Sequence, residues 1–377
     1  MPPFQNHFDF LKNNKRNKRV IALENFIYET LPEKVIFGRG RRNEILQEIK
    51  EWQTDRVLII STNGRRNIAE EIWSQLGEKA VGLHTSAKQH VPQESVKEAV
   101  GIIQNNRADA LLTVGGGSAI GLAKAAVLET KLPILAVPTT YSGSEMTPVW
   151  GITKDNKKQT GRNSQVKPKT VIYDSELTET MPPYMSLTSG VNAMAHCVEA
   201  LYAEKRNPIT SIIAEEGFRA LFHSLESIVR EPEHKGAREE AFYGSWLAGM
   251  ALASVDMSLH HKLCHALGGI AALPHAETHT IMLPYVLSYN ASNTSKVLTK
   301  LGKIMNVPAH DVPDHLHHWI INSGGPSALS EIGWQKQNIT QIAEEVSEKA
   351  YPNPRPVNKE NMENLLQSAF IGEICNL

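Results

Sequence analysis

Three pairs of polar residues, each separated by four positions, mark the second half of this 377-residue chain. The pairs are Asn192/His196, His261/His265 and His275/His279. Residues i and i+4 lie on the same face of an α-helix, so each pair would point two side chains in one direction. Histidine placed in this way is typically a metal ligand or an acid/base group that titrates near neutral pH. The sequence therefore predicts a site for metal-ion or acid/base chemistry.

The segments that carry these pairs have helical periodicity. After Met181, long stretches repeat apolar residues at helical spacing, and strand-like runs nearly disappear. The predicted helices in this half cover residues 186–203, 209–229, 237–254 and 258–273. We therefore expect an all-α domain over residues 183–377 that holds the paired histidines.

The first half has a different sequence pattern, in which short apolar runs alternate with amphipathic segments. The apolar runs predict strands over residues 56–61, 108–114 and 133–137, with outer strands at 35–37 and 170–173. Helical patterns such as 68–76 and 94–105 lie between them. Continuous apolar strands separated by helices indicate a parallel sheet that is covered on both faces. We expect a Rossmann-like α/β domain over residues 25–182, a polar exposed hairpin or loop at 151–169, and an active site in the cleft between the two domains.

A glycine-rich segment follows the second predicted strand. Gly115, Gly116, Gly117 and Ser118 lie between that strand and a helical run at 119–128. Glycines let the backbone approach a ligand closely, and the N-terminus of the following helix favours an anion. The segment suits the pyrophosphate of a dinucleotide, although it is not the G-x-G-x-x-G fingerprint and could be only a tight turn.

Two further strand ends carry residues that suit a coenzyme. Thr139, Thr140 and Ser142 place hydroxyl groups after the third predicted strand, where they could bind ribose, phosphate or carboxamide. Asn63 follows the first predicted strand and precedes two arginines, with no carboxylate to bind both ribose hydroxyls. The sequence therefore allows either NADH or NADPH.

Composition excludes some classes of function. The chain has 39 basic and 40 acidic residues, which argues against nucleic acid or a membrane surface as a partner. No stretch approaches the roughly 20 apolar residues of a membrane span. Three cysteines without a C-x-x-C pair indicate reduced thiols and a cytoplasmic protein. Residues 1–24 include the basic stretch 12–19, which we interpret as a solvated, flexible extension.

Several segments match a known family in order and spacing. They are FGRG at 37–40, GGGS at 115–118, PTTYSGSE at 138–145, GVNAMAHCVEA at 190–200, HHKLCHALGG at 260–269 and PHAETHTIMLPYV at 274–286. From about Phe26 onward, the chain resembles the iron-containing alcohol dehydrogenase superfamily, which has a dehydroquinate synthase-like architecture. Within that superfamily it is most similar to the maleylacetate reductases, through stretches such as QHVP at 89–92 and TGRN at 160–163.

The resemblance implies a specific reaction. Maleylacetate reductases use NADH or NADPH to reduce the conjugated double bond of maleylacetate to 3-oxoadipate, in the catabolism of aromatic compounds. A homodimer with a small dicarboxylate substrate is therefore expected. Two other functions stay open, namely a metal-dependent alcohol or polyol dehydrogenase and a non-catalytic nucleotide-binding protein.

One departure from the superfamily pattern bears on the metal. The superfamily's ligand positions correspond to Asn192, His196, His261 and His275, and the first is usually an aspartate. A neutral amide supplies no charge to offset a divalent cation, although three imidazoles alone can bind zinc. Because maleylacetate reductases point the same way, we expect an enzyme without a metal.

The same resemblance suggests roles for individual residues. His261 and His265 are expected to act as the central electrophile and acid, with His196 and His275 beside them. The predicted substrate-binding residues are Asn192, Tyr243, Arg162, Ser142, Lys262 and His279. The case for Lys262 is weakened, since it would point away from the helix face shared by His261 and His265.

Overall fold

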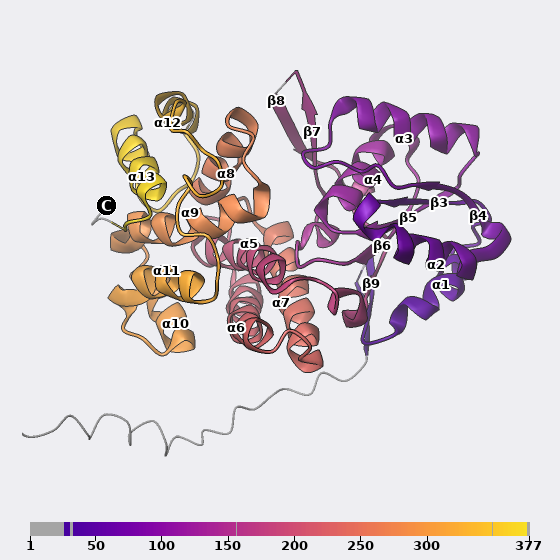
Figure 1. Cartoon of the computed structure of the whole chain (residues 1–377), viewed down its shortest axis with the longest axis horizontal. Helices are drawn as coiled ribbons and strands as arrows, with labels where there is room; N and C mark the ends of the chain where they lie inside the picture. The colour runs from indigo at the N-terminus through magenta and orange to yellow at the C-terminus, as the bar shows by residue number, and fades with distance from the viewer. Residues whose placement is uncertain (1–25, 31–32, 156, 349, 375–377) are drawn as a thin grey trace, which may run out of the picture.

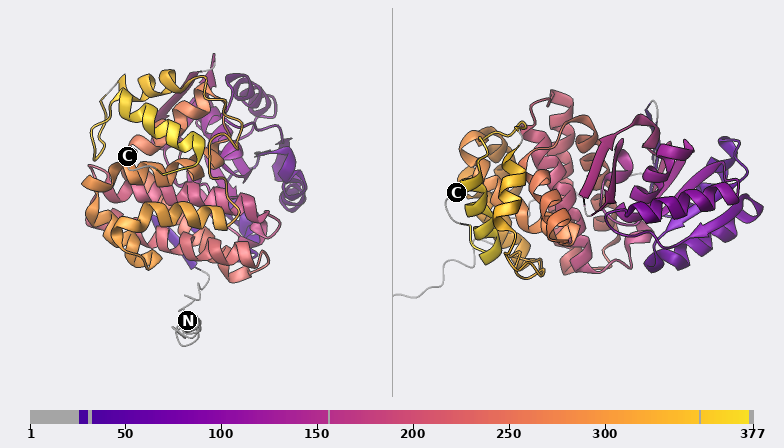
Figure 2. Two further views of the ribbon diagram at one scale, coloured as in Figure 1. Left: turned by 60° about the vertical axis from the view of Figure 1, so that its left-hand side comes forward. Right: turned by 90° about the horizontal axis from the view of Figure 1, so that it is seen from above.

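The structure is a computed structural model that describes residues 26–30, 33–155, 157–348 and 350–374. The predicted extension at residues 1–24 lies outside the described residues. An α/β half and a helical half follow each other along the chain and lie side by side (Figure 1). Seen from above, the sheet occupies one end of an elongated molecule and the C-terminal helices occupy the other (Figure 2). The fold class predicted from the sequence is confirmed, while the exact domain boundary near residue 182 stays a prediction.

A seven-stranded sheet organises the first half. Its order is β1-β2-β9-β6-β5-β3-β4, and only β1 runs antiparallel to its neighbour. The strands are β1 (Phe26–Thr30), β2 (Glu33–Phe37), β3 (Val57–Ser61), β4 (Ala80–His84), β5 (Ala110–Gly115), β6 (Ile134–Pro138) and β9 (Thr170–Tyr173). β3, β5, β6 and β9 are buried along their whole length, which explains their mainly apolar sequences.

Helices cover both faces of this sheet. α1 (Ile45–Glu51) and α2 (Arg66–Leu76) share one hydrophobic core with one face, and α3 (Gln93–Asn105) and α4 (Gly117–Thr130) share a second core with the other. From β3, the chain adds β4 on one side and β5 on the other. This reversal makes the carboxyl ends of β3 and β5 a topological switch point, where open α/β sheets bind their ligands.

A separate two-stranded hairpin leaves the sheet half. β7 (Val149–Lys154) and β8 (Lys157–Arg162) pair antiparallel, in agreement with the expected hairpin. Figure 1 shows it standing above the junction between the two halves. β8 contacts helix α8 of the helical half.

The second half consists of helices. They are α5 (Pro183–Tyr202), α6 (Pro208–Arg230), α7 (Lys235–Ser254), α8 (Leu259–Ile270), α9 (His275–Asn290), α10 (Ser295–Met305), α11 (Val312–Asn322), α12 (Ile339–Glu348) and α13 (Lys359–Ile371). α5 contacts α6, α7 and α9, and it is buried over nearly its whole length. None of the helices in the described part of the chain combines the length and apolar character that a bilayer span requires.

Candidate active site

One buried face of α5 carries three polar side chains. Asn192, His196 and Glu199 follow one another at intervals of four and three residues, so they share this face. Glu199 is fully buried, and Asn192 and His196 are each only 4% exposed. Polar groups at such depth need partners, from the protein or from a ligand.

Glu199 binds the first turn of α8. Its Oε2 atom lies 2.7 Å from Nδ1 of His261 and accepts from the backbone N–H of Ser258, while Oε1 accepts from that of His260. Burial alone would raise the pKa of Glu199, but the charge and hydrogen bond of His261 lower it below the ordinary value. This contact fixes the His261 ring, whose Nε2 atom is buried with no partner among the described residues.

Sequence reasoning missed Glu199, although a signal was present. Glu199 lies three residues after His196 and seven after Asn192, which continues the spacing of the first polar pair. A fully buried carboxylate on that face could have been proposed as a partner for a histidine.

Five imidazoles from three helices form what we call the histidine cluster: His196, His261, His265, His275 and His279. The ring centroids of His196 and His261 are 5.1 Å apart, and those of His261 and His279 are 5.0 Å apart. His265 and His275 complete the cluster, with centroids 6.4 Å from each other. The i,i+4 pairs predicted from the sequence therefore do meet in space.

Most of the histidine cluster is electrically neutral at neutral pH. Desolvation, followed by neighbouring positive charge, lowers the pKa of His196, His265 and His279 well below the ordinary value. The same causes lower the pKa of His275 to about 3. Neutral imidazoles can donate one hydrogen bond and accept another, so these four side chains act as uncharged hydrogen-bonding groups.

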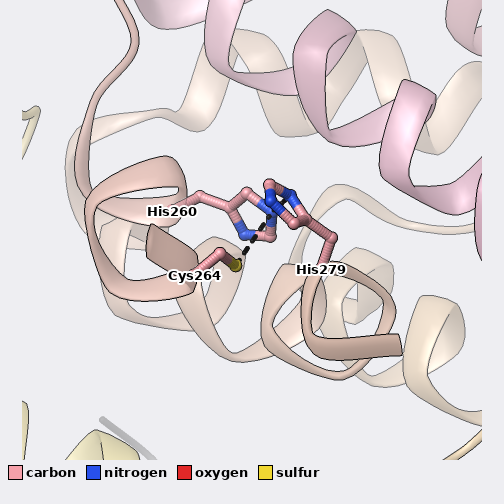
Figure 3. Close-up of side chains that lie close together, drawn as sticks. All are labelled: His260, Cys264 and His279. Carbon is pink, nitrogen blue, oxygen red and sulfur yellow. Dashed lines mark hydrogen bonds between the residues drawn. The ribbon is translucent and has the colours of Figure 1, made fainter. Parts of the chain in front are cut away.

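His260 and Cys264 lie together with His279 of the histidine cluster (Figure 3). Their candidate donor atoms are all within 4.8 Å of one another, which is compact enough for a metal ion. However, Nε2 of His260 and Nδ1 of His279 are hydrogen-bonded to each other at 2.9 Å, so both facing nitrogens are already used. Burial also raises the pKa of the Cys264 thiol well above its ordinary value. Cys264 Sγ lies 3.7 Å from Nε2 of His260, while Nδ1 of His260 and Nε2 of His279 are buried without a partner among the described residues.

The glycine-rich segment and the following loop are in close contact at the ends of β5 and β6. A Cβ atom on Gly116 would lie 2.4 Å from Oγ1 of Thr140, so only glycine fits there. The backbone N–H of Thr139 donates to the carbonyl of Gly115, and Oγ1 of Thr139 is buried without a partner in the described chain. Gly117 and Ser118 begin α4, whose N-terminal amides face the same region.

We call Gly115 to Gly117, together with the N-terminus of α4, the glycine cradle. The remaining predicted coenzyme residues border this cradle. A Cβ atom on Gly117 would lie 3.9 Å from that of Ser142, whose hydroxyl donates to Glu145. Asn63 lies at the end of β3 with an exposed side chain that accepts from Thr85. The glycine cradle, the orphan threonine hydroxyl and the helix N-terminus fit the pyrophosphate of a nicotinamide coenzyme.

Gly143 connects the cradle to the histidine cluster. It has a φ of +69°, which a side chain would strain. A Cβ atom there would lie 3.1 Å from Cα of Gly249 on α7 and 3.4 Å from Nδ1 of His196. Residues 139–143, which we call the coenzyme loop, therefore lie directly beside His196 of the histidine cluster.

Comparison with known proteins agrees with this geometry. Residues 32–175 match the iron-containing alcohol dehydrogenase family, and residues 186–370 match the C-terminal part of the Fe-containing alcohol dehydrogenase family. A maleylacetate reductase of Sphingobium indicum is 42% identical over 347 residues, covering 92% of this chain and 98% of its own. The chain belongs to the maleylacetate reductases of the iron-containing alcohol dehydrogenase family.

Solved structures support the same family assignment. The crystal structure of maleylacetate reductase from Agrobacterium tumefaciens has a TM-score of 0.86 and 40% identity, over 94% of this chain and 100% of that one. The maleylacetate reductase from Rhizobium sp. strain MTP-10005 has a TM-score of 0.85 and 41% identity, with the same coverage of both chains. The similarity therefore extends over both halves of the chain.

Three predicted substrate-binding residues of this maleylacetate reductase homologue make other contacts. Tyr243 packs against Trp246 on its own helix. The ammonium of Lys262 lies 5.6 Å from the ring centroid of Tyr351. Arg162 donates to the backbone carbonyl of Ala253, which ties β8 to the end of α7. The structure thus brings the five histidines together and keeps Asn192 on the same buried face of α5 as His196, but places Tyr243 and Lys262 in separate contacts.

The family name implies iron, and the donor set fits a divalent metal only in part. His261 presents a buried, unpaired Nε2 atom with its other nitrogen held by a carboxylate, as in many metal sites. At the remaining family positions, Asn192 offers a neutral carbonyl oxygen, and His196 and His275 offer neutral imidazoles. Since no directly coordinating position carries a negative charge, these residues do not fit the family's charged iron site.

Proposed function

We propose that this protein is a maleylacetate reductase that reduces the carbon–carbon double bond of maleylacetate to give 3-oxoadipate. The observation that carries this proposal is the buried Glu199–His261 pair within a cluster of neutral imidazoles, directly beside the coenzyme loop. The names of relatives that match over nearly the whole chain agree with it.

The substrate sets clear demands on the site. It is a dianion in which a ketone is conjugated to the double bond, with a carboxylate at each end. Reduction adds a hydride to the carbon β to the ketone, moves negative charge onto the ketone oxygen as an enolate, and then adds a proton to the α carbon. NADH or NADPH supplies the hydride when bound in the glycine cradle.

The histidine cluster meets these demands through hydrogen bonds. Neutral His196 and His275 can donate N–H groups to the enolate oxygen, in a buried site where such bonds are strong. Asn192 can add its amide N–H groups from the same face of α5. Together they replace the positive charge that a metal ion would otherwise supply.

His261 is the group best placed to deliver the proton. The carboxylate of Glu199 lies against Nδ1 of His261 and fixes the ring, which leaves the buried Nε2 atom to carry the proton that is delivered. Glu199 itself does not touch the substrate and acts as a positioning residue. The rings of His265 and His279 lie against the ring of His261 and help to keep it in position.

Cofactor and assembly form part of the same proposal. We infer a metal-free resting enzyme that accepts NADH or NADPH, because no carboxylate occupies the first ligand position. A cytoplasmic homodimer stays a prediction from the family.

One assay tests the proposal directly. Purified protein is mixed with maleylacetate and either NADH or NADPH, and absorbance of the reduced coenzyme is followed. We expect rapid oxidation that survives prolonged chelation, with less than one equivalent of iron or zinc per chain by elemental analysis. Absence of oxidation with both coenzymes would refute the activity, whereas loss in chelator and recovery with zinc or iron would refute only the metal-free state.

A further inference from the structure

A lysine of the β7–β8 hairpin lies on the strand that contacts α8, one of the three helices of the histidine cluster. Lys158 pairs with Thr153 across the hairpin, and its Cε atom lies 3.3 Å from where a Cβ atom of Gly151 would be. The side chain therefore runs across the hairpin, which leaves it half-buried. Its ammonium makes no ion pair with any residue that the structure describes. A partly buried cation without a counter-ion is costly unless a ligand supplies one.

The hairpin is fixed to both halves of the molecule. Thr153 donates through its backbone N–H to Val91 and through its hydroxyl to the carbonyl of His90, at 2.9 and 2.6 Å. On the other strand, Arg162 donates to the carbonyl of Ala253 at the end of α7. The position of Lys158 relative to the cluster is therefore set by the fold.

The turn beneath the hairpin is strained. His90 and Val91 both have left-handed backbone angles, with φ values of +60° and +48°. Such a conformation is unfavourable for a β-branched residue and is often kept at functional sites. The turn places Cε1 of His90 3.5 Å from where a Cβ atom of Gly268 on α8 would lie, so a further imidazole borders the cluster.

The positive charge of Lys158 is not balanced by the neighbouring described residues, which favours the binding of an anion. After desolvation, Lys158 is the largest cause of the lowered pKa of His265, His275 and His90. These imidazoles are kept neutral beside an unpaired ammonium, and each can still donate one hydrogen bond. One cation and several donors without a counter-ion suit a carboxylate.

We propose that Lys158 binds one terminal carboxylate of the dicarboxylate substrate, with His265 as the neighbouring donor. This inference rests on the proposed function. It makes Lys158 a specificity-determining residue for a charged substrate, which an alcohol dehydrogenase for neutral substrates does not need. A coenzyme phosphate is the other possible source of the anion, and the glycine cradle already supplies amides for that group.

The test compares Lys158→Gln with Lys158→Arg and Lys154→Gln. Lys154 is an exposed lysine on β7 of the same hairpin, so its variant controls for charge alone. For Lys158→Gln we expect KM for maleylacetate to rise about 10- to 100-fold, with the dissociation constant of NADH unchanged within about twofold. Lys158→Arg should recover part of the affinity, and Lys154→Gln should behave as wild type.

A binding assay keeps the inference separate from the reductase activity. Thermal stabilisation by adipate, a dicarboxylate, is compared with that by pentanoate, a monocarboxylate, in the wild type and in Lys158→Gln. Selective loss of the adipate effect would support the inference even if maleylacetate were not reduced. An unchanged KM and adipate effect would overturn it, and so would an equal weakening of NADH binding, which would assign Lys158 to the coenzyme.

Discussion

The Nδ1 atom of His261 lies 2.7 Å from Oε2 of the fully buried Glu199, 62 residues earlier in the chain. The same carboxylate accepts two backbone N–H groups at the start of α8. One side chain thus orients the proposed acid and caps the helix that carries it.

Glu199→Gln should lower kcat more than it lowers stability. The amide keeps a hydrogen-bond acceptor but loses the negative charge that lies against Nδ1 of His261, so we expect kcat to fall about 100-fold or more. KM for NADH should change little. Steady-state kinetics and thermal unfolding are measured beside Glu204→Gln, an exposed residue just after α5. A kcat within threefold of wild type would contradict the acid role of the pair.

Gly116→Ala should weaken coenzyme binding. The new Cβ atom would lie 2.4 Å from Oγ1 of Thr140, which would push the coenzyme loop away from the glycine cradle. We expect the dissociation constant of NADH, measured by fluorescence titration, to rise at least about tenfold. Gly101→Ala is the matched control, because that position in α3 has open space around it. Equal affinity in both variants would count against the cradle.

Asn192→Asp should turn the cluster into a better metal site. A carboxylate on this face of α5 supplies the missing negative charge next to His196 and His261. We expect zinc affinity to rise at least about tenfold over the wild type, with a matching rise in melting temperature when zinc is added. Isothermal titration and elemental analysis measure this. No gain in metal binding would show that geometry, and not charge, keeps the metal out.

Stability should fall as the pH is lowered below about 6.5. Desolvation lowers the pKa of His84 below its ordinary value and that of His260 to about 3. Histidines of the unfolded chain bind protons near pH 6.5. Between that pH and the folded values the unfolded chain binds more protons, so the free energy of unfolding decreases as pH falls.

A single variant tests the contribution of His84. His84→Leu should flatten the dependence of unfolding free energy on pH by at most about 1.4 kcal/mol per pH unit between pH 6.5 and 4. Denaturant titrations at several pH values measure this slope. His310→Gln, at an exposed position, should leave the slope unchanged. An equal slope in the His84 variant would mean that this histidine becomes protonated in the folded state.

The parts of the fold that depend on local sequence were predictable. The parallel strands β3, β5 and β6 and the helices α5 to α8 follow from apolar runs and periodicity, and their bounds differ from expectation by only a few residues. The three i,i+4 pairs predicted a shared site because each pair lies on one helix face.

The contacts that complete the site were not predictable in the same way. Glu199 meets His261 across 62 positions, and Lys158 lies on a hairpin strand that contacts α8 although the sequence marks this segment only as polar. Tyr243 has the helical position expected of it, but its ring packs against Trp246. Such partners depend on how helices pack and on side-chain direction, which spacing along one segment does not specify.

The close approach of Gly143 to Gly249 has a consequence for how this enzyme can change. Two backbones meet there without a side chain between them, and His196 borders the same contact. A substitution that shifts the coenzyme loop must therefore also displace α7 or the first histidine. Coenzyme binding and the chemistry of the reduced double bond are therefore mechanically linked, so a change made to one of them through this loop will alter the other.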